Sequence, residues 1–327
     1  MFARICALVL LLTSAKAAQQ DSKLRVQSNV VLVPTLVKDA EGHIVYGLTQ
    51  NDFVIEDDGV EQAVRMDASA ESEPASVVVA VQTGRRAWRE YSRMHGIGPM
   101  LTPVFDQLHS RVALVEFDSQ VNMVENFSED DTSILEDLKK LQPGDNGAAI
   151  RDAIEFSGRL LEKEPVERQR VLLLVCENRD HGSHVAKTDE VVAAIGNSST
   201  VVYALAFSPS RSQVLDTERG SNRDEAYWDA PPDIIGTLLM ARNAMKKNIT
   251  KAIAAMTGGE YELFTSRKAF EGQMVDFNNH LHSRYVLSFA PQRPHPGLHQ
   301  IVVRLKQAQP GTSILSRTSY WAMGTAP

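Results

Sequence analysis

The chain has 327 residues, with 34 Lys and Arg against 41 Asp and Glu and a formal net charge of −7 at pH 7. A chain of this length can bury one large core or two smaller ones. The acidic excess gives no electrostatic reason to expect binding to nucleic acid, and we predict none.

The N-terminus has the layout of a secretory signal peptide. Arg4 precedes an apolar run from Ile5 to Leu12, and small residues at Ala15 and Ala17 stand at cleavage spacing. The run is too short for an ordinary membrane-spanning helix. We therefore expect residues 1–18 to be removed, no membrane span in the mature protein, and a secreted or periplasmic location. Retention of this segment as a membrane anchor stays open.

The two cysteines predict no disulfide within the mature chain. Cys6 lies in the predicted signal peptide, which leaves Cys176 alone. Cys176 follows the apolar run Leu172 to Val175 and has no adjacent histidine. We interpret it as a small buried side chain at the end of a strand and not as a nucleophile.

Residues 24–70 predict a small antiparallel β segment. Strand signals fall at residues 26–37, 43–46, 53–56 and 60–66. The sequence Asp57-Asp58-Gly59 indicates a tight turn between the last two strands. Such a unit is too small to be stable alone, so we expect it to pack on a partner sheet.

Residues 74–283 alternate between strand and helix signals and predict an α/β domain. The run from Val77 to Val81 has no polar face, which is typical of a strand buried on both sides of a parallel sheet. Further strands are predicted over 111–117, 121–127, 170–176, 201–207 and 260–264. Helices are predicted over 86–108 with breaks near Gly96, Gly98 and Pro99, then over 131–141, 148–162, 188–195 closed by Gly196 and Asn197, 233–256, and 266–282.

Residues 284–323 return to strand signals, at 285–290, 297–306 and 313–322. Because both ends of the chain predict antiparallel strands, we expect them to pair into one β-sandwich into which the α/β domain is inserted. Two separate β appendages would each leave a sheet face unmet. The long polar stretch 208–232 has no periodicity and predicts a mobile surface loop.

Several short phrases at both ends of the chain are distinctive: Gly47-Leu48-Thr49, Asp52 to Gly59 with Gln62, Thr257-Gly258-Gly259, Tyr285 to Phe289, and Arg317 to Tyr320. Together they resemble the acidobacterial proteins related to von Willebrand factor A domains. The resemblance covers nearly the whole mature chain. It implies a von Willebrand A-type, Rossmann-like fold, which is a mostly parallel sheet with helices on both faces.

The resemblance also implies where a metal-ion-dependent adhesion site would lie, and the sequence departs from it. The family pattern is Asp-x-Ser-x-Ser after the first strand of the sheet, a Thr on a second loop and an Asp after a later strand. Oxygen ligands of this kind suit a hard cation such as Mg²⁺. The matching positions hold Gln82, Gly84, Arg86, Ala148 and Glu177. We therefore predict a degenerate site without metal or cofactor.

Charged residues near this degenerate site leave two alternatives open. Arg85 or Arg86 could stand in the cation's place as a counter-charge to Glu177, or both could be solvated. The acids Asp145, Glu177 and Asp180 could also form a weak, rearranged cation site that supports metal-dependent adhesion.

The sequence predicts an interaction protein and not an enzyme. No acid–base or nucleophile constellation is evident, and Asp180 to His184 is interpreted as a loop. We expect a non-catalytic protein-interaction or adhesion-type module. Its protein partner, which the sequence does not identify, is expected to bind at the end of the sheet and at the 208–232 loop. The candidate partner-binding residues are Arg85, Arg86, Asp145, Asn146, Glu177 and Asp180. A hydrolase with an unrecognised site stays open, as does the oligomeric state.

Overall fold

The computed structural model describes residues 30–66, 74–94, 96–108, 110–207, 242–293 and 295–322. The predicted signal peptide, the predicted loop 208–232 and the start of the helix predicted from residue 233 lie outside these ranges. Within them, no helix combines the length and the apolar character that crossing a membrane requires.

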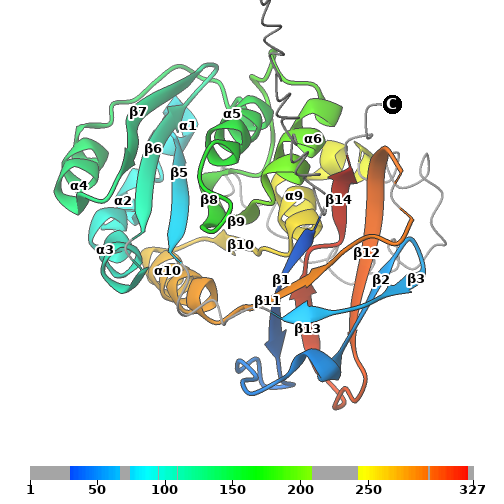
Figure 1. Cartoon of the computed structure of the whole chain (residues 1–327). Coiled ribbons are helices and arrows are strands. Elements are labelled where there is room, and N and C mark those ends of the chain that lie inside the picture. The colour runs from blue at the N-terminus through cyan, green and yellow to red at the C-terminus, as the bar shows by residue number, and fades with distance from the viewer. Residues whose placement is uncertain are drawn as a thin grey trace, which may run out of the picture.

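A six-stranded sheet forms the centre of the α/β part (Figure 1). Its order is β10 (Tyr261–Phe264), β9 (Val201–Phe207), β8 (Gln169–Glu177), β5 (Ala75–Gln82), β6 (Arg111–Phe117) and β7 (Val121–Ser128). Neighbouring strands are parallel except for β7, which forms an antiparallel hairpin with β6. Every residue of β5 is buried, with Val77 and Val79 in one core and Val78 and Ala80 in the other. This confirms the strand predicted from the apolar run.

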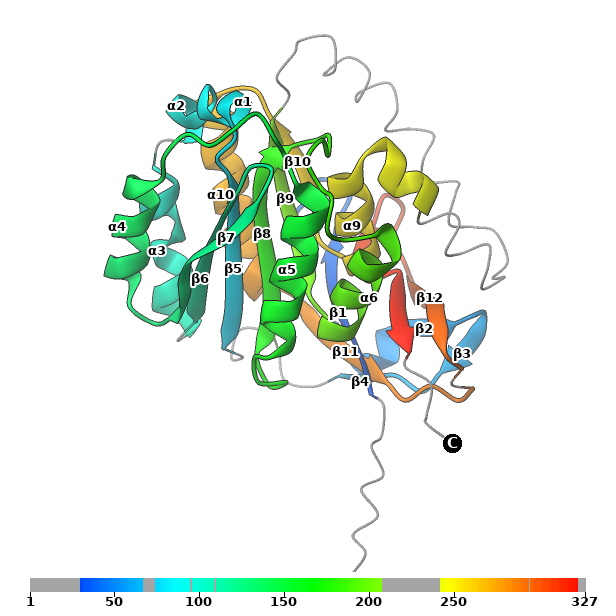
Figure 2. The same cartoon turned by 90° about the horizontal axis from the view of Figure 1, so that it is seen from above.

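Helices cover both faces of this sheet (Figure 2). One face packs against α1 (Arg85–Trp88), α2 (Tyr91–Met94), α3 (Ile97–Leu108), α4 (Asp131–Lys140) and α10 (Arg267–His282). The other packs against α5 (Ile150–Glu162), α6 (Thr188–Ser198) and α9 (Ile249–Thr257). The predicted break near Gly96 is confirmed, because Gly96 has a φ of 107° between α2 and α3. Pro99 instead lies in the first turn of α3, where a missing N–H costs nothing.

The predicted end of α6 is wrong, because the helix continues through Gly196 and Asn197 to Ser198. Ser199 ends it in the left-handed conformation, with a φ of 53°. The glycine has a packing role instead: a Cβ at position 196 would lie 2.8 Å from the Cβ of Trp321. Gly196 therefore lets a strand of the C-terminal segment approach the helix closely.

The two ends of the chain form a β-sandwich of two four-stranded sheets. One has the order β13 (Ser313–Ser316), β1 (Val31–Lys38), β11 (Tyr285–Phe289) and β4 (Arg65–Met66). The other has the order β14 (Ser319–Ala322), β12 (Gly297–Leu305), β2 (Phe53–Asp57) and β3 (Val60–Gln62). N-terminal strands pair with C-terminal ones in both sheets, and a shared core includes Val33, Phe53 and Leu287. The predicted sandwich around an inserted α/β unit is confirmed.

Two details of the sandwich differ from the sequence prediction. Residues 43–46 form no strand; Ile44 makes only an isolated bridge with Lys38. The strand predicted over 313–322 breaks at Arg317 and Thr318, where the chain crosses from one sheet to the other. The buried guanidinium of Arg317 lies at this break and donates to the carbonyl oxygens of Ser319 at 2.7 Å and Gly196 at 2.8 Å.

The α/β unit and the sandwich meet at the segment between α9 and β10. Gly258 ends α9 in the left-handed conformation, with a φ of 73°, and lies against the backbone of Ser316. Glu260 follows, and its carboxylate lies 2.9 Å from Nζ of Lys38 on β1 and 2.7 Å from Nδ1 of His280 on α10. One buried carboxylate thus joins the N-terminal strand to the α/β unit.

Replacing Glu260 by glutamine is expected to reduce the loss of unfolding free energy that the wild type shows as the pH falls from 7 to 2. Burial acts to raise the pKa of Glu260, but His280 and Lys38 outweigh it and lower the pKa from 4.5 to about 2. A lowered carboxyl pKa contributes stability that is present above pH 4.5 and is lost as the pH falls toward 2, on the order of 2 kcal/mol. Urea unfolding of Glu260→Gln from pH 2 to 7 measures this.

The neighbouring carboxyl supplies the control for this prediction. Burial raises the pKa of Glu262, so Glu262→Gln should lose none of the acid-linked stability. Equal pH profiles for the wild type and Glu260→Gln would contradict the assigned role of Glu260.

Candidate functional site

The carboxyl ends of β5 and β8 lie side by side in the middle of the sheet, at an edge that we call the crest. The chain runs from β5 to β6 on one side of this point and later returns to β8 on the other. In open α/β sheets, ligands bind in the crevice at such a reversal of strand order. Gln82 is the last residue of β5 and Glu177 is the last residue of β8.

Gln82 and Glu177 bind each other through two hydrogen bonds. The amide Nε2 of Gln82 donates to Oε1 of Glu177 at 2.9 Å, and the backbone N–H of Glu177 donates to Oε1 of Gln82 at 2.8 Å. The ring Nε2 of His181 lies 2.6 Å from the same carboxylate oxygen. Both Gln82 and Glu177 are buried, whereas the His181 ring is partly exposed. An amide–carboxylate–imidazole chain therefore occupies the two positions where the family pattern has acids.

The remaining positions of the family pattern supply no side-chain oxygen at the crest. Ala148 is buried and has no hydroxyl. A Cβ at Gly84 would overlap the carbonyl oxygen of Gly147, so a serine does not fit there without moving the loop. This loop is fixed to the end of β5, since Gly144 N–H donates to Thr83 O at 2.8 Å. The residues present do not fit a hard dication, which needs several free oxygen ligands.

The two arginines at the crest point to solvent. Arg85 and Arg86 are exposed at the start of α1. The counter-charge position beside Glu177 is taken by the imidazole of His181 and the amide of Gln82 instead. His181 is not among the site residues predicted from the sequence; its position four residues after the carboxylate that ends β8 was the available signal.

Asp145 and Asn146 are exposed beside these arginines. The Asp145 carboxylate accepts hydrogen bonds from the Ser119 hydroxyl and from the backbone N–H of Gly147. These bonds, with a smaller contribution from the charge of Arg85, lower the pKa of Asp145. The exposed rim of the crest therefore carries both signs of charge.

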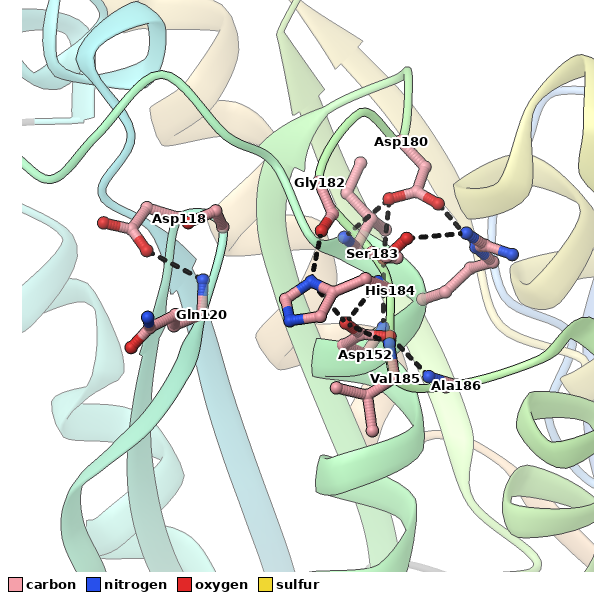
Figure 3. A network of polar contacts seen from close by, with 12 residues as sticks. Asp118, Gln120, Asp152, Asp180, Gly182, Ser183, His184, Val185 and Ala186 are labelled. Carbon is pink, nitrogen blue, oxygen red and sulfur yellow. Dashed lines mark hydrogen bonds and ion pairs between the residues drawn. The ribbon is translucent and has the colours of Figure 1, made fainter.

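Asp180 is held within its own loop and does not point freely to solvent. Its Oδ2 accepts from Nε of Arg151 at 2.6 Å, and its Oδ1 accepts from the Ser183 hydroxyl at 2.7 Å (Figure 3). Asp152, on the first turn of α5, accepts from the backbone N–H groups of three consecutive residues, of which Ala186 is the nearest at 2.7 Å (Figure 3). These two carboxylates fix the loop after β8 to α5. Asp152 was missed because an acid inside a helix pattern indicates a surface residue.

The loop holds no serine–histidine pair. The Ser183 hydroxyl donates to Asp180, and Nδ1 of His184 lies 2.9 Å from the carbonyl oxygen of Gly182. Cys176 is fully buried in β8, and burial raises its pKa well above the usual value. The prediction that Cys176 is a small buried side chain at the end of a strand is confirmed.

A second polar cluster lies in the sandwich, where Asp57 and Asp58 at the end of β2 meet His299 on β12. The ring Nδ1 of His299 is 3.2 Å from Oδ1 of Asp57 and 2.8 Å from Oδ2 of Asp58. Burial acts to lower the pKa of His299, but these carboxylates outweigh it and raise the pKa to about 10. The sequence indicated only a turn here, because the partners lie at opposite ends of the chain.

Comparison with known proteins agrees with this architecture. Residues 90–178 match the von Willebrand factor type A domain family. This segment begins just after α1, ends one residue past β8, and contains the β6–β7 hairpin and α5. The α/β unit therefore has the von Willebrand A-type fold. No curated protein matches the chain.

Solved structures with a similar fold come from several sources. BatB from Bacteroides thetaiotaomicron is 16% identical over 63% of this chain and 99% of its own, with a TM-score of 0.40. The proximal thread matrix protein 1 from the mussel byssus is 11% identical over 68% of this chain and 49% of its own, with a TM-score of 0.46. The vWF domain of the pili tip protein Mfa5 from Porphyromonas gingivalis is 8% identical over 64% and 95%, with a TM-score of 0.42.

Proposed function

We propose that the protein is a non-catalytic interaction or adhesion-type module that binds a protein partner at the crest without a metal ion. The observation that carries this proposal is the pairing of Gln82 with Glu177, completed by His181. The carboxylate that a cation would use is satisfied by internal donors. Removing these donors to admit a dication would leave the Gln82 amide unpaired in a buried site, which is costly.

The surface offered to the partner is the exposed rim formed by Arg85, Arg86, Asp145 and Asn146. Glu177 and Asp180, the other candidates, are engaged in internal hydrogen bonds with Gln82 and Arg151, which leaves them less available to a partner. Charges of both signs within one rim favour a partner with a complementary charge pattern and influence the rate and specificity of association more than its strength.

The proposal also includes the cellular location of the protein and the type of family that it resembles. The signal-like residues 1–18 support a secreted or periplasmic location, and the phrases in residues 47–62 and 285–320 support the acidobacterial type. The geometry of Ser183 and His184 supports a role without catalysis.

Metal ions are expected to leave the crest unchanged. Calorimetric titration with millimolar Mg²⁺ or Mn²⁺ should give no saturable heat that depends on Glu177, and Mg²⁺ should not raise the melting temperature, because an ion that does not bind the native state cannot stabilise it. A saturable site in the micromolar range that disappears in Glu177→Ala would contradict the proposal and favour metal-dependent adhesion.

A pull-down experiment with the purified protein tests the binding surface. Partners captured from the native envelope should be retained in EDTA and lost with the double variant Arg85→Glu/Arg86→Glu. Arg65→Glu is the matched control, since Arg65 is an exposed arginine on β4 of the sandwich. Equal losses for both variants would count against the crest as the binding surface.

A further inference from the structure

Three side chains in the sandwich bring their ligand atoms within 4.8 Å of one another: Asp58, His295 and His299. Asp58 lies in the turn between β2 and β3, His299 on β12, and His295 just before β12. Oδ2 of Asp58 is 3.0 Å from Nε2 of His295 and 2.8 Å from Nδ1 of His299. Within the described ranges, this is the one cluster of three such ligands.

Backbone carbonyl groups set the proton positions on the two rings. Nε2 of His299 lies 2.8 Å from the carbonyl oxygen of His295, and Nδ1 of His295 lies 3.4 Å from that of Pro296. Because a carbonyl oxygen only accepts, these nitrogens carry the protons. The opposite nitrogen of each ring faces Oδ2 of Asp58 at hydrogen-bonding distance, and a metal ion that displaced the proton there would bind these same nitrogens. Metal-binding histidines in proteins have this arrangement, with the second nitrogen donating to a carbonyl or carboxylate oxygen.

The charge of the cluster also calls for a cation. Asp57 lies next to Asp58 in the chain, and its carboxylate is 3.2 Å from His299 while accepting from the Tyr320 hydroxyl at 3.1 Å. With both rings neutral, two carboxylates beside a fully buried imidazole carry two negative charges. Buried charge of one sign is costly, so a proton or a metal ion must stand among these groups.

The backbone aims the Asp58 carboxylate at the two rings. Asp58 has a φ of 48°, which is uncommon for a residue other than glycine. Two hydrogen bonds to Gln300 hold it there, from Asp58 N–H to Gln300 O at 2.9 Å and from Gln300 N–H to Oδ1 of Asp58 at 2.9 Å. Oδ1 is therefore occupied and Oδ2 is left for the histidines.

We propose that Asp58, His295 and His299 form a binding site for a transition-metal dication of the zinc type. Two imidazole nitrogens and one carboxylate oxygen suit Zn²⁺ much better than Mg²⁺ or Ca²⁺, and three protein ligands leave a fourth position open. The two rings are nearly parallel, with centroids 3.8 Å apart and an interplanar angle of 15°. One ring must therefore turn to share an ion, and His295, partly exposed outside β12, has room to do so.

A metal ion at this position would link the two ends of the chain. Asp58 belongs to the N-terminal segment, and both histidines belong to the C-terminal segment. The ion would thus join the β2–β3 turn to β12 in the sandwich and raise the stability of the folded state by mass action.

Calorimetric titration of the full chain with ZnCl₂ tests the site. The expected result is saturable binding of one ion per chain and a higher melting temperature, with no response to MgCl₂. His295→Gln should weaken zinc binding by more than about 100-fold and should still fold, because its side chain is partly exposed. Asp58→Asn should weaken it likewise. A tetrahedral d–d spectrum with Co²⁺ that is lost in the same variants provides a second readout.

Two control variants separate this site from the crest. His184→Gln removes an exposed histidine of the loop after β8, and Glu177→Ala removes the crest carboxylate. Both should keep the wild-type zinc affinity. Absence of saturable zinc binding, or equal zinc affinity in His295→Gln and the wild type, would overturn the proposal and leave the cluster as a hydrogen-bonded network.

Discussion

Gly259→Ala is expected to destabilise the protein more than any other single change considered, by on the order of 3 kcal/mol or more. A Cβ at position 259 would overlap the carbonyl oxygen of Val202 and lie 2.6 Å from its carbonyl carbon. Val202 is held in place, since it lies in β9 between β8 and β10 and its N–H donates to the Thr257 hydroxyl at 3.0 Å. Urea unfolding followed by circular dichroism measures the loss.

Gly272→Ala is the matched control for this prediction. Gly272 is exposed in α10, and a Cβ there would meet nothing within 4 Å. Alanine in an open helical position is favoured over glycine by about 0.5–1 kcal/mol, so this variant should be slightly more stable than the wild type. Similar stabilities for the two variants would show that the contact of Gly259 with β9 is not required.

Gln82→Leu is expected to cost about 3 kcal/mol of stability. The change removes the amide donor from the buried carboxylate of Glu177 and the acceptor from the Glu177 backbone N–H. Loss of the amide donor lowers the stability more, because it leaves the buried charge of Glu177 less compensated. The partly exposed ring of His181 would remain as the single side-chain donor to the carboxylate in the described crest.

The double variant Gln82→Leu/Glu177→Leu tests the origin of this cost. Replacing both partners by apolar side chains of similar size removes the buried charge, so the double variant should be more stable than Gln82→Leu alone. If the two single losses simply add, Gln82 and Glu177 are not coupled and our description of the crest is wrong.

The architecture was predictable because its main signals are local. The apolar run from Val77 to Val81 has no polar face, and only a strand covered on both sides satisfies it. The sandwich was predictable by a similar argument, since the end segments each had an apolar face to bury. The end of α6 was not predictable, because Gly196 is needed for close packing against Trp321, which lies far along the chain. Local propensity gives no information about such a contact.

The crest was predictable only in part. Strand ends place Gln82 and Glu177 at the same edge of the sheet, and the sequence indicates this directly. Their mutual hydrogen bonds, and the choice of His181 over an arginine as the second donor, depend on the path of the loop after β8. The cluster of Asp58 and His299 is harder still to predict. Its residues meet only because β2 pairs with β12, and no sequence periodicity connects strands so far apart in the chain.

The insertion of the α/β unit determines the order in which the chain can fold. β4 and β11 are neighbours in one sheet, with Met66 opposite Leu287, so the chain leaves and re-enters the sandwich at adjacent strands. During synthesis from the N-terminus, β2 can pair with β3 at once, but β1 and the other edge of β2 lack their strand partners until the C-terminal segment has emerged. The intervening α/β unit can form earlier, and once compact it brings both halves of the sandwich together and shortens the loop that must close. A prematurely ended chain would expose apolar strands with unpaired edges, which favours aggregation and removal. The sandwich can therefore close only after strands β11 to β14 have been synthesised.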